Sequence, residues 1–111
     1  MKFSKIVLVC CLLPYIAFAG QNEYVGKVDT IKADGGKIFI TLKGGSSSPT
    51  CGTGNSFYLD PTNDYDKSIL SLAITAKATN NEVYALGGGT CQSAWPYKNR
   101  LKLVSFVLKS T

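Results

Sequence analysis

The chain offers few residues that could perform catalysis. It contains no histidine, which removes the commonest general base and every Ser-His or Cys-His nucleophilic arrangement. The carboxylates Asp60, Asp64 and Asp66 fall where a helix is expected to begin, and helix capping explains them. The same segment lacks the carboxylate spacing, turn glycine and final glutamate of an EF-hand calcium loop. We therefore expect no catalytic residue, no metal site and no cofactor.

The most informative segment is a loop expected at residues 92–99. It places the only tryptophan, Trp95, beside Tyr97, Lys98 and Asn99. Aromatic rings can stack on the apolar faces of sugars, while amide and ammonium groups can bond sugar hydroxyls. Two interpretations stay open: these four residues bind a ligand, or Trp95 fills the end of a β-barrel as a core side chain.

Three consecutive glycines, at residues 87–89, follow an expected strand. A phosphate-binding glycine loop would need a helix directly after it, and no helical pattern follows here. The glycines therefore predict a bend or bulge in the strand.

The elements expected around the loop are five strands and one helix. The strands are predicted at residues 24–33, 37–43, 56–60, 82–86 and 100–109, with the glycine run and Cys91 after the fourth strand, and the helix is predicted at residues 64–78. Residues 44–49 are predicted to be a loop. This order predicts a mainly β protein: a small five-stranded OB-like Greek-key barrel with one helix between the third and fourth strands. An open antiparallel sheet with a helix across it is the alternative.

The last strand is apolar on both faces. One face, with Leu101, Leu103, Ser105 and Val107, is predicted to fill the barrel, and the other, outer face carries Val104, Phe106 and Leu108. A strand buried on both sides is typical of a barrel seam or of a subunit interface.

The first 19 residues have the pattern of a signal peptide. Lys2 and Lys5 precede an apolar run, and Ala17 and Ala19 give an A-x-A cleavage site. The run is short for a membrane span and contains Pro14. We expect a secreted or periplasmic protein without membrane insertion, with residues 20–111 as a single domain.

Only Cys51 and Cys91 remain after this cleavage. In an exported protein such a pair predicts a disulfide. A zinc site is the alternative, but two cysteines without histidine cannot complete its ligand set.

The charge balance argues against nucleic acid as a partner. Removing Lys2 and Lys5 leaves ten basic and seven acidic side chains, a net charge of +3. Single-stranded nucleic acid stays a third hypothesis, with Phe39, Tyr58 and Tyr84 as stacking platforms, but export and this modest charge disfavour it.

The chain resembles the B subunits of pentameric bacterial toxins of the enterotoxin-like and subtilase-cytotoxin-like groups. The resemblance covers the architecture of most of residues 24–110 and the motif in residues 91–99: a cysteine, then a tryptophan-bearing polar loop. It implies that Trp95, Asn99 and Lys98 hold a terminal galactose. It also implies a cell-surface glycan, a homo-oligomeric ring and a secreted catalytic subunit as partners. This chain departs from the enterotoxin pattern in the order of Lys98 and Asn99 and in the position of Cys51.

These observations favour a secreted, non-catalytic binding module that recognises glycan. The alternative is a periplasmic or envelope structural or interaction protein without a small-molecule site, whose last strand docks a partner chain.

Overall fold

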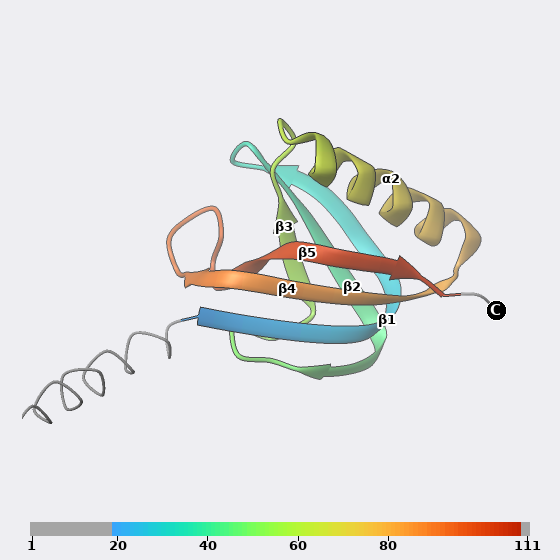
Figure 1. Cartoon of the computed structure of the whole chain (residues 1–111), viewed down its shortest axis with the longest axis horizontal. Helices are drawn as coiled ribbons and strands as arrows, with labels where there is room; N and C mark the ends of the chain where they lie inside the picture. Colours follow the sequence, from blue (N-terminus) through green and yellow to red (C-terminus); the bar gives the residue numbers. More distant parts are fainter. Residues whose placement is uncertain (1–18, 110–111) are drawn as a thin grey trace, which may run out of the picture.

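The computed structural model describes residues 19–109 (Figure 1). Residues 1–18, which carry most of the predicted signal peptide, lie outside the described residues, as do residues 110–111. The structure is mainly β, and the predicted order of three strands, a helix and two strands is confirmed. The elements are β1 (Ala19–Asp34), β2 (Lys37–Ser48), β3 (Ser56–Leu59), α2 (Asp64–Thr79), β4 (Glu82–Gln92) and β5 (Arg100–Leu108).

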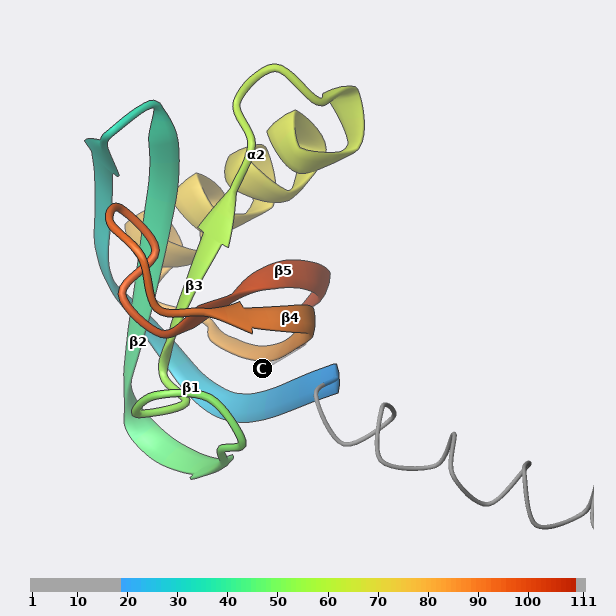
Figure 2. The ribbon, with the colours of Figure 1, turned by 90° about the vertical axis from the view of Figure 1, so that its left-hand side faces the viewer.

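The five strands form one closed ring in the order β1-β2-β3-β5-β4, with β4 pairing back to β1. Every neighbouring pair is antiparallel except β3 and β5, which run parallel. Strand β1 is strongly bent (Figures 1 and 2), and it pairs with β4 over residues 19–27 and with β2 over residues 23–34. The open antiparallel sheet is therefore wrong for this chain.

The hairpin between β1 and β2 is longer than predicted. Its turn is made by Gly35 and Gly36, both at positive φ. Residues 44–48, predicted as a loop, continue β2 because they pair with β1 as far as Glu23. Gly45 permits this pairing, since a Cβ there would lie 1.5 Å from the carbonyl oxygen of Val25.

The core fills the inside of the ring and the space beneath the helix. Alternation places Ile40 and Leu42 of β2 and Phe57 and Leu59 of β3 inside, all almost fully buried. At Gly87 a side chain is excluded by the ring of Phe57, because a Cβ would lie 2.6 Å from Phe57 Cδ1. The predicted bulge at the glycines is confirmed by register shifts on either side of Gly87 and Gly88.

Helix α2 packs against β1, β3 and β5 (Figure 1). It begins at the cap residue Asn63, whose side chain accepts the Asp66 amide, and ends at Asn80 in the left-handed conformation, within one residue of the predicted range. Ile69, Ala73 and Ala76 are buried. Leu72 and Ile74 lie outside this buried face, at 40% and 54% exposure.

A bulge in β5 changes which side chains enter the core. Leu86 pairs with Ser105 and Gly87 with Leu103, so Val104 is an extra residue. Beyond the bulge the alternation is inverted: Phe106 is buried at 7% exposure and Val107 is 48% exposed. The predicted outer face of Val104, Phe106 and Leu108 is therefore wrong, since Phe106 and Leu108 both pack against the core.

Among residues 19–109, no helix combines the length and apolar character needed to cross a bilayer.

Candidate functional site

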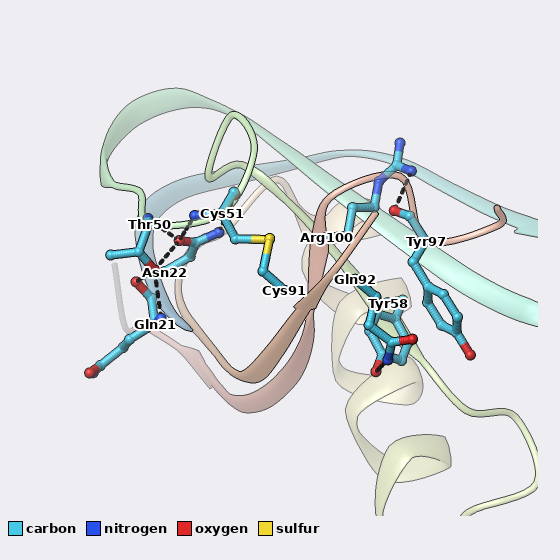
Figure 3. The surroundings of a disulfide bond; sticks show 9 residues. All are labelled: Gln21, Asn22, Thr50, Cys51, Tyr58, Cys91, Gln92, Tyr97 and Arg100. Atoms are coloured by element: carbon cyan, nitrogen blue, oxygen red, sulfur yellow. Dashed lines mark hydrogen bonds between the residues drawn. A yellow bond between two sulfur atoms is a disulfide. The ribbon is translucent and has the colours of Figure 1, made fainter. Parts of the chain in front are cut away.

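A disulfide anchors the strand that leads into the candidate loop. Cys51 and Cys91 are bonded, with their Cα atoms 5.7 Å apart, which confirms the predicted pair (Figure 3). Cys91 lies inside β4 rather than after it. Because Cys51 is 3% exposed, the bond is largely buried, which indicates an oxidising setting.

The buried side chain of Asn22 holds the segment around Cys51 in place. Its Oδ1 accepts the Cys51 amide at 3.0 Å and the Thr50 amide at 2.5 Å, and its Nδ2 donates to the Cys51 carbonyl at 2.7 Å (Figure 3). The Asn22 side chain can be fully buried because its polar atoms are hydrogen-bonded. Sequence reasoning missed Asn22, since a polar residue in a strand normally indicates the solvent face.

The loop of residues 93–99 connects β4 to β5 and packs against the β1–β2 turn. A Cβ at Gly35 would lie 2.6 Å from Pro96 Cβ and 2.9 Å from Trp95 Cη2. The Trp95 side chain is nevertheless 63% exposed, so the interpretation of Trp95 as a core residue is wrong. The Cη2 edge of the indole therefore lies against the Gly35 turn, while most of the side chain is open to solvent.

Two backbone bonds close the loop on itself. The amide of Asn99 donates to the Gln92 carbonyl at 2.8 Å, and the amide of Lys98 donates to the Ala94 carbonyl at 3.0 Å. Lys98 and Asn99 both adopt positive φ and have exposed side chains. The loop therefore presents an aromatic, an ammonium and an amide group from a hydrogen-bonded frame.

The outer face of β2 and β3 lies next to this loop. Phe39 of β2 and Tyr58 of β3 are cross-strand partners there. The Arg100 guanidinium covers Phe39, with its Cζ 4.8 Å from the ring centroid, and Phe39 is only 2% exposed. Arg100 Nε donates to Ser56 Oγ at 2.6 Å and Nη1 donates to the Tyr97 carbonyl at 3.2 Å.

Tyr97 brings the loop into contact with the sheet. Its ring centroid lies 4.7 Å from that of Tyr58, with the planes tilted by 60°. Gln92 Nε2 donates to Tyr58 Oη at 3.5 Å, and Figure 3 shows these side chains grouped beside Arg100. Burial, followed by the nearby Tyr97 hydroxyl, raises the pKa of Tyr58 above its ordinary value.

This pKa shift predicts a loss of stability in alkali. A raised folded-state pKa means that stability from neutral Tyr58 is fully present below the unfolded pKa near 10 and is lost as pH rises through the folded value. The Tyr58→Phe variant should therefore lose less stability than the wild type between neutral and strongly alkaline pH. Urea denaturation followed at both pH values measures this difference, and equal losses in the two proteins would contradict the prediction.

Asp66 lies beneath the same face, and its role differs from the predicted one. Its side chain is fully buried and binds Lys102, with Nζ 2.6 Å from Oδ1. Its Oδ2 accepts the Asp60 amide at 2.7 Å. The carboxylate therefore links the start of α2 to the residue that follows β3 and to β5. Capping and the helix dipole alone did not predict this link.

Asp60 has a local structural role. Its carboxylate accepts both the amide and the hydroxyl of Thr62, and these bonds lower the pKa of Asp60. In the part of the chain that the structure describes, no three His, Cys, Asp or Glu residues gather as a metal site would require.

The three aromatic residues considered for nucleic acid do not form one platform. Tyr84 lies on β4, which neighbours β1 and β5 and not β2 or β3. Its hydroxyl donates to Glu23 at 3.1 Å, which raises the pKa of Tyr84. Phe39 is covered by Arg100, so only Tyr58 of the three is accessible at the loop.

The candidate site is therefore a surface face, and residues 19–109 form no concave pocket there. Of the four predicted residues, Trp95, Lys98 and Asn99 are exposed on the loop, while Tyr97 is half-buried against Tyr58. Sequence reasoning missed Phe39, Tyr58 and Arg100 as parts of one cluster. The available signal was strand alternation. It places Phe39 and Tyr58 on the face of their strands that points away from the core, where side chains are normally polar.

No protein-family model, no curated protein and no solved structure matches this chain in the three comparisons made.

Proposed function

We propose that this protein is a secreted or periplasmic, non-catalytic OB-type module that binds glycan through the loop of residues 93–99 and the outer face of β2 and β3. The order of strands and the helix between β3 and β4 support this proposal. In OB barrels, oligosaccharides and oligonucleotides bind across the second and third strands and the loops 1–2 and 4–5. The corresponding elements here are the Gly35–Gly36 turn and the loop that contains Trp95.

The observation that carries the proposal is the exposed indole of Trp95. A large aromatic side chain is normally mostly buried, and this one is 63% exposed while its far edge rests on the Gly35 turn. A sugar ring can stack on such a supported surface without rearranging the protein. Lys98 and Asn99 extend beside it and supply donors and an acceptor for hydroxyl groups.

The Trp95→Ala variant tests the proposal. We expect a loss of binding on a glycan array, because the stacking surface is removed. The free energy of unfolding should change by less than about 1 kcal/mol, because no core cavity is opened. Tyr65→Ala is the matched control, since Tyr65 is 57% exposed on α2 and lies outside the site.

Two results would contradict the proposal. One is a wild-type protein that binds no glycan on the array. The other is a Trp95→Ala protein that keeps all binding, or whose stability falls by the amount typical of a core tryptophan, about 3–5 kcal/mol.

The toxin-like assembly is the further part of this proposal. A homo-oligomeric ring of B subunits would present several copies of the loop, and a secreted catalytic subunit would join it. Multivalent presentation would raise the apparent affinity for a surface glycan without new contacts.

A second candidate function is that of an interaction protein without a small-molecule site. The lack of a pocket in residues 19–109 favours it, as do the exposed Val104 and Val107 on β5, at 39% and 48%. Beside Val104, the Tyr65 hydroxyl of α2 donates to the Val104 carbonyl at 2.8 Å. The Val107→Lys variant described in the Discussion also tests this candidate.

A further inference from the structure

The cations of this protein are unevenly paired. Within the described residues, four lysines lie within 4.0 Å of a carboxylate: Lys43, Lys67, Lys102 and Lys109. Six other basic residues have no such partner there: Lys27, Lys32, Lys37, Lys77, Lys98 and Arg100. The positions of these six residues therefore determine where the protein carries positive charge that no carboxylate pairs with.

Four of the six lie around the candidate site. Lys32 of β1 is the cross-strand partner of Phe39, and Lys37 is on the same side of β2 as Phe39 by alternation. Arg100 covers Phe39, and Lys98 is exposed on the loop. Lys27 and Lys77 lie elsewhere. Lys27 is the cross-strand neighbour of Lys43 on β2 and of Glu82 on β4, and the Lys77 ammonium donates to the Asp29 carbonyl.

The acidic residues nearby do not cancel this charge. Asp66 is paired with Lys102, and Asp60 lies close enough to Lys37 and Lys102 for their charges to help lower its pKa, so these two carboxylates offset part of the positive charge. Asp34 is the exposed acid at the edge of the turn. Among the described residues, this face carries five cations, counting Lys102, and three carboxylates. The net charge of the face is therefore +2.

Arg100 is held ready to bind an anion. Two of its five N–H groups donate to Ser56 and Tyr97, which fixes the guanidinium over Phe39. The remaining N–H groups form a fork of the kind that binds carboxylate or sulfate oxygens in pairs. Because its position is already fixed, little side-chain entropy would be lost on binding.

The shape of the face indicates the form of the ligand. A single terminal sugar is usually held in a concavity that buries most of its surface, and residues 19–109 hold no such pocket. The cations are instead spread from Lys32 of β1 across Lys37 of β2 to Lys98 on the loop. Such a spread fits a chain with repeated charges better than one sugar.

We propose that this face binds an extended acidic polysaccharide, whose carboxylate or sulfate groups pair with Arg100, Lys32, Lys37 and Lys98 while one sugar ring stacks on Trp95. This inference rests on the proposed glycan-binding function and adds the class of ligand. Single-stranded nucleic acid shares the repeated negative charge. The disulfide indicates an oxidising setting, and Tyr84 lies away from the face, so the structure favours the saccharide.

The test compares four probes of equal chain length by calorimetry: a heparin oligosaccharide, an oligogalacturonate, a maltooligosaccharide and single-stranded DNA. At low ionic strength we expect the two acidic saccharides to bind at least about tenfold more tightly than the neutral one. Their affinity should fall as salt is added, whereas binding of the maltooligosaccharide should not.

Matched double variants show whether the charges act locally. Lys32→Gln with Lys98→Gln removes two exposed cations of the face and should weaken acidic saccharide binding by about tenfold. Lys27→Gln with Lys77→Gln removes the same net charge elsewhere and should change it by less than about twofold. Thermal unfolding curves confirm that both proteins are folded.

The outcomes separate the two proposals. Equal affinity for acidic and neutral saccharides, with binding lost in Trp95→Ala, overturns this inference and leaves the proposed function intact. Absence of binding to any saccharide overturns both. Equal losses in the two double variants, or tighter binding of DNA than of either acidic saccharide, overturn the assignment of an acidic polysaccharide to this face.

Discussion

Phe106→Lys should leave the chain unfolded, whereas Val107→Lys at the next position should leave it folded. Phe106 is 7% exposed and packs in the core, so its replacement removes the packed ring and places an ammonium group there without a partner. Removing a buried phenylalanine ring costs up to about 3–5 kcal/mol, and burying an unpaired charge costs several kcal/mol more. The sum is comparable with the whole stability of a small domain, about 5–15 kcal/mol.

Val107→Lys provides the matched control for this prediction. The Val107 side chain is 48% exposed on the outer face, where lysine can reach water, and a change within about 0.5 kcal/mol is expected. Circular dichroism and urea denaturation measure both variants. A folded Phe106→Lys protein would show that the bulge at Val104 is absent and that the simple alternation along β5 holds.

The same pair tests the interaction-protein candidate. If β5 docks a second chain through its exposed valines, light scattering should show a lower mass for Val107→Lys than for the wild type, with the fold retained. A wild-type protein that is already monomeric at micromolar concentration would exclude self-association through β5.

The β5 error shows what strand periodicity can and cannot predict. Alternation placed Leu101 and Leu103 correctly in the core, because each residue reverses the side-chain direction. The bulge at Val104 depends on how β5 pairs with Leu86 and Gly87 of β4, far away in the sequence. One extra residue inverts every later position, so Phe106 and Val107 were exchanged.

Similar non-local causes explain the other differences. Residues 44–48 contain only glycine and serine, which locally indicate a loop, yet their pairing with β1 makes them strand. Helix limits were predicted well because Asn63 and Asn80 act on their own backbone neighbours. Local chemistry was therefore readable from sequence, and partner-dependent structure was not.

The candidate site divides in the same way. The loop was found because its one tryptophan and its polar neighbours are adjacent in sequence. The cluster of Phe39, Tyr58 and Arg100 was not found, because it comes from three separate strands whose alignment only the folded ring fixes. Asp66 was assigned to the helix dipole for the same reason, since its partner Lys102 lies on β5.

Reduction of the Cys51–Cys91 disulfide should lower the free energy of unfolding by about 4 kcal/mol. The bond closes a loop with a sequence separation of 40 residues, and the chain-entropy estimate for such a loop gives this value. The loss is most of the stability of a marginal domain of this size. Urea denaturation with and without a reductant measures it, and the Cys51→Ala, Cys91→Ala double variant should match the reduced wild type and show no further response to the reductant.

The structure also indicates where the reduced protein should loosen first. Cys91 is followed directly by Gln92, whose carbonyl accepts the Asn99 amide and whose side chain donates to Tyr58. Cys51 keeps its bonds to Asn22 after reduction, so its own loop stays anchored while the end of β4 does not. Hydrogen exchange should therefore quicken at Asn99 before it quickens at Cys51, and glycan binding should weaken under conditions where the reduced protein is still folded. An unchanged denaturation midpoint after complete reduction, or equal acceleration at both amides, would show that the disulfide does not hold the loop of residues 93–99 in place.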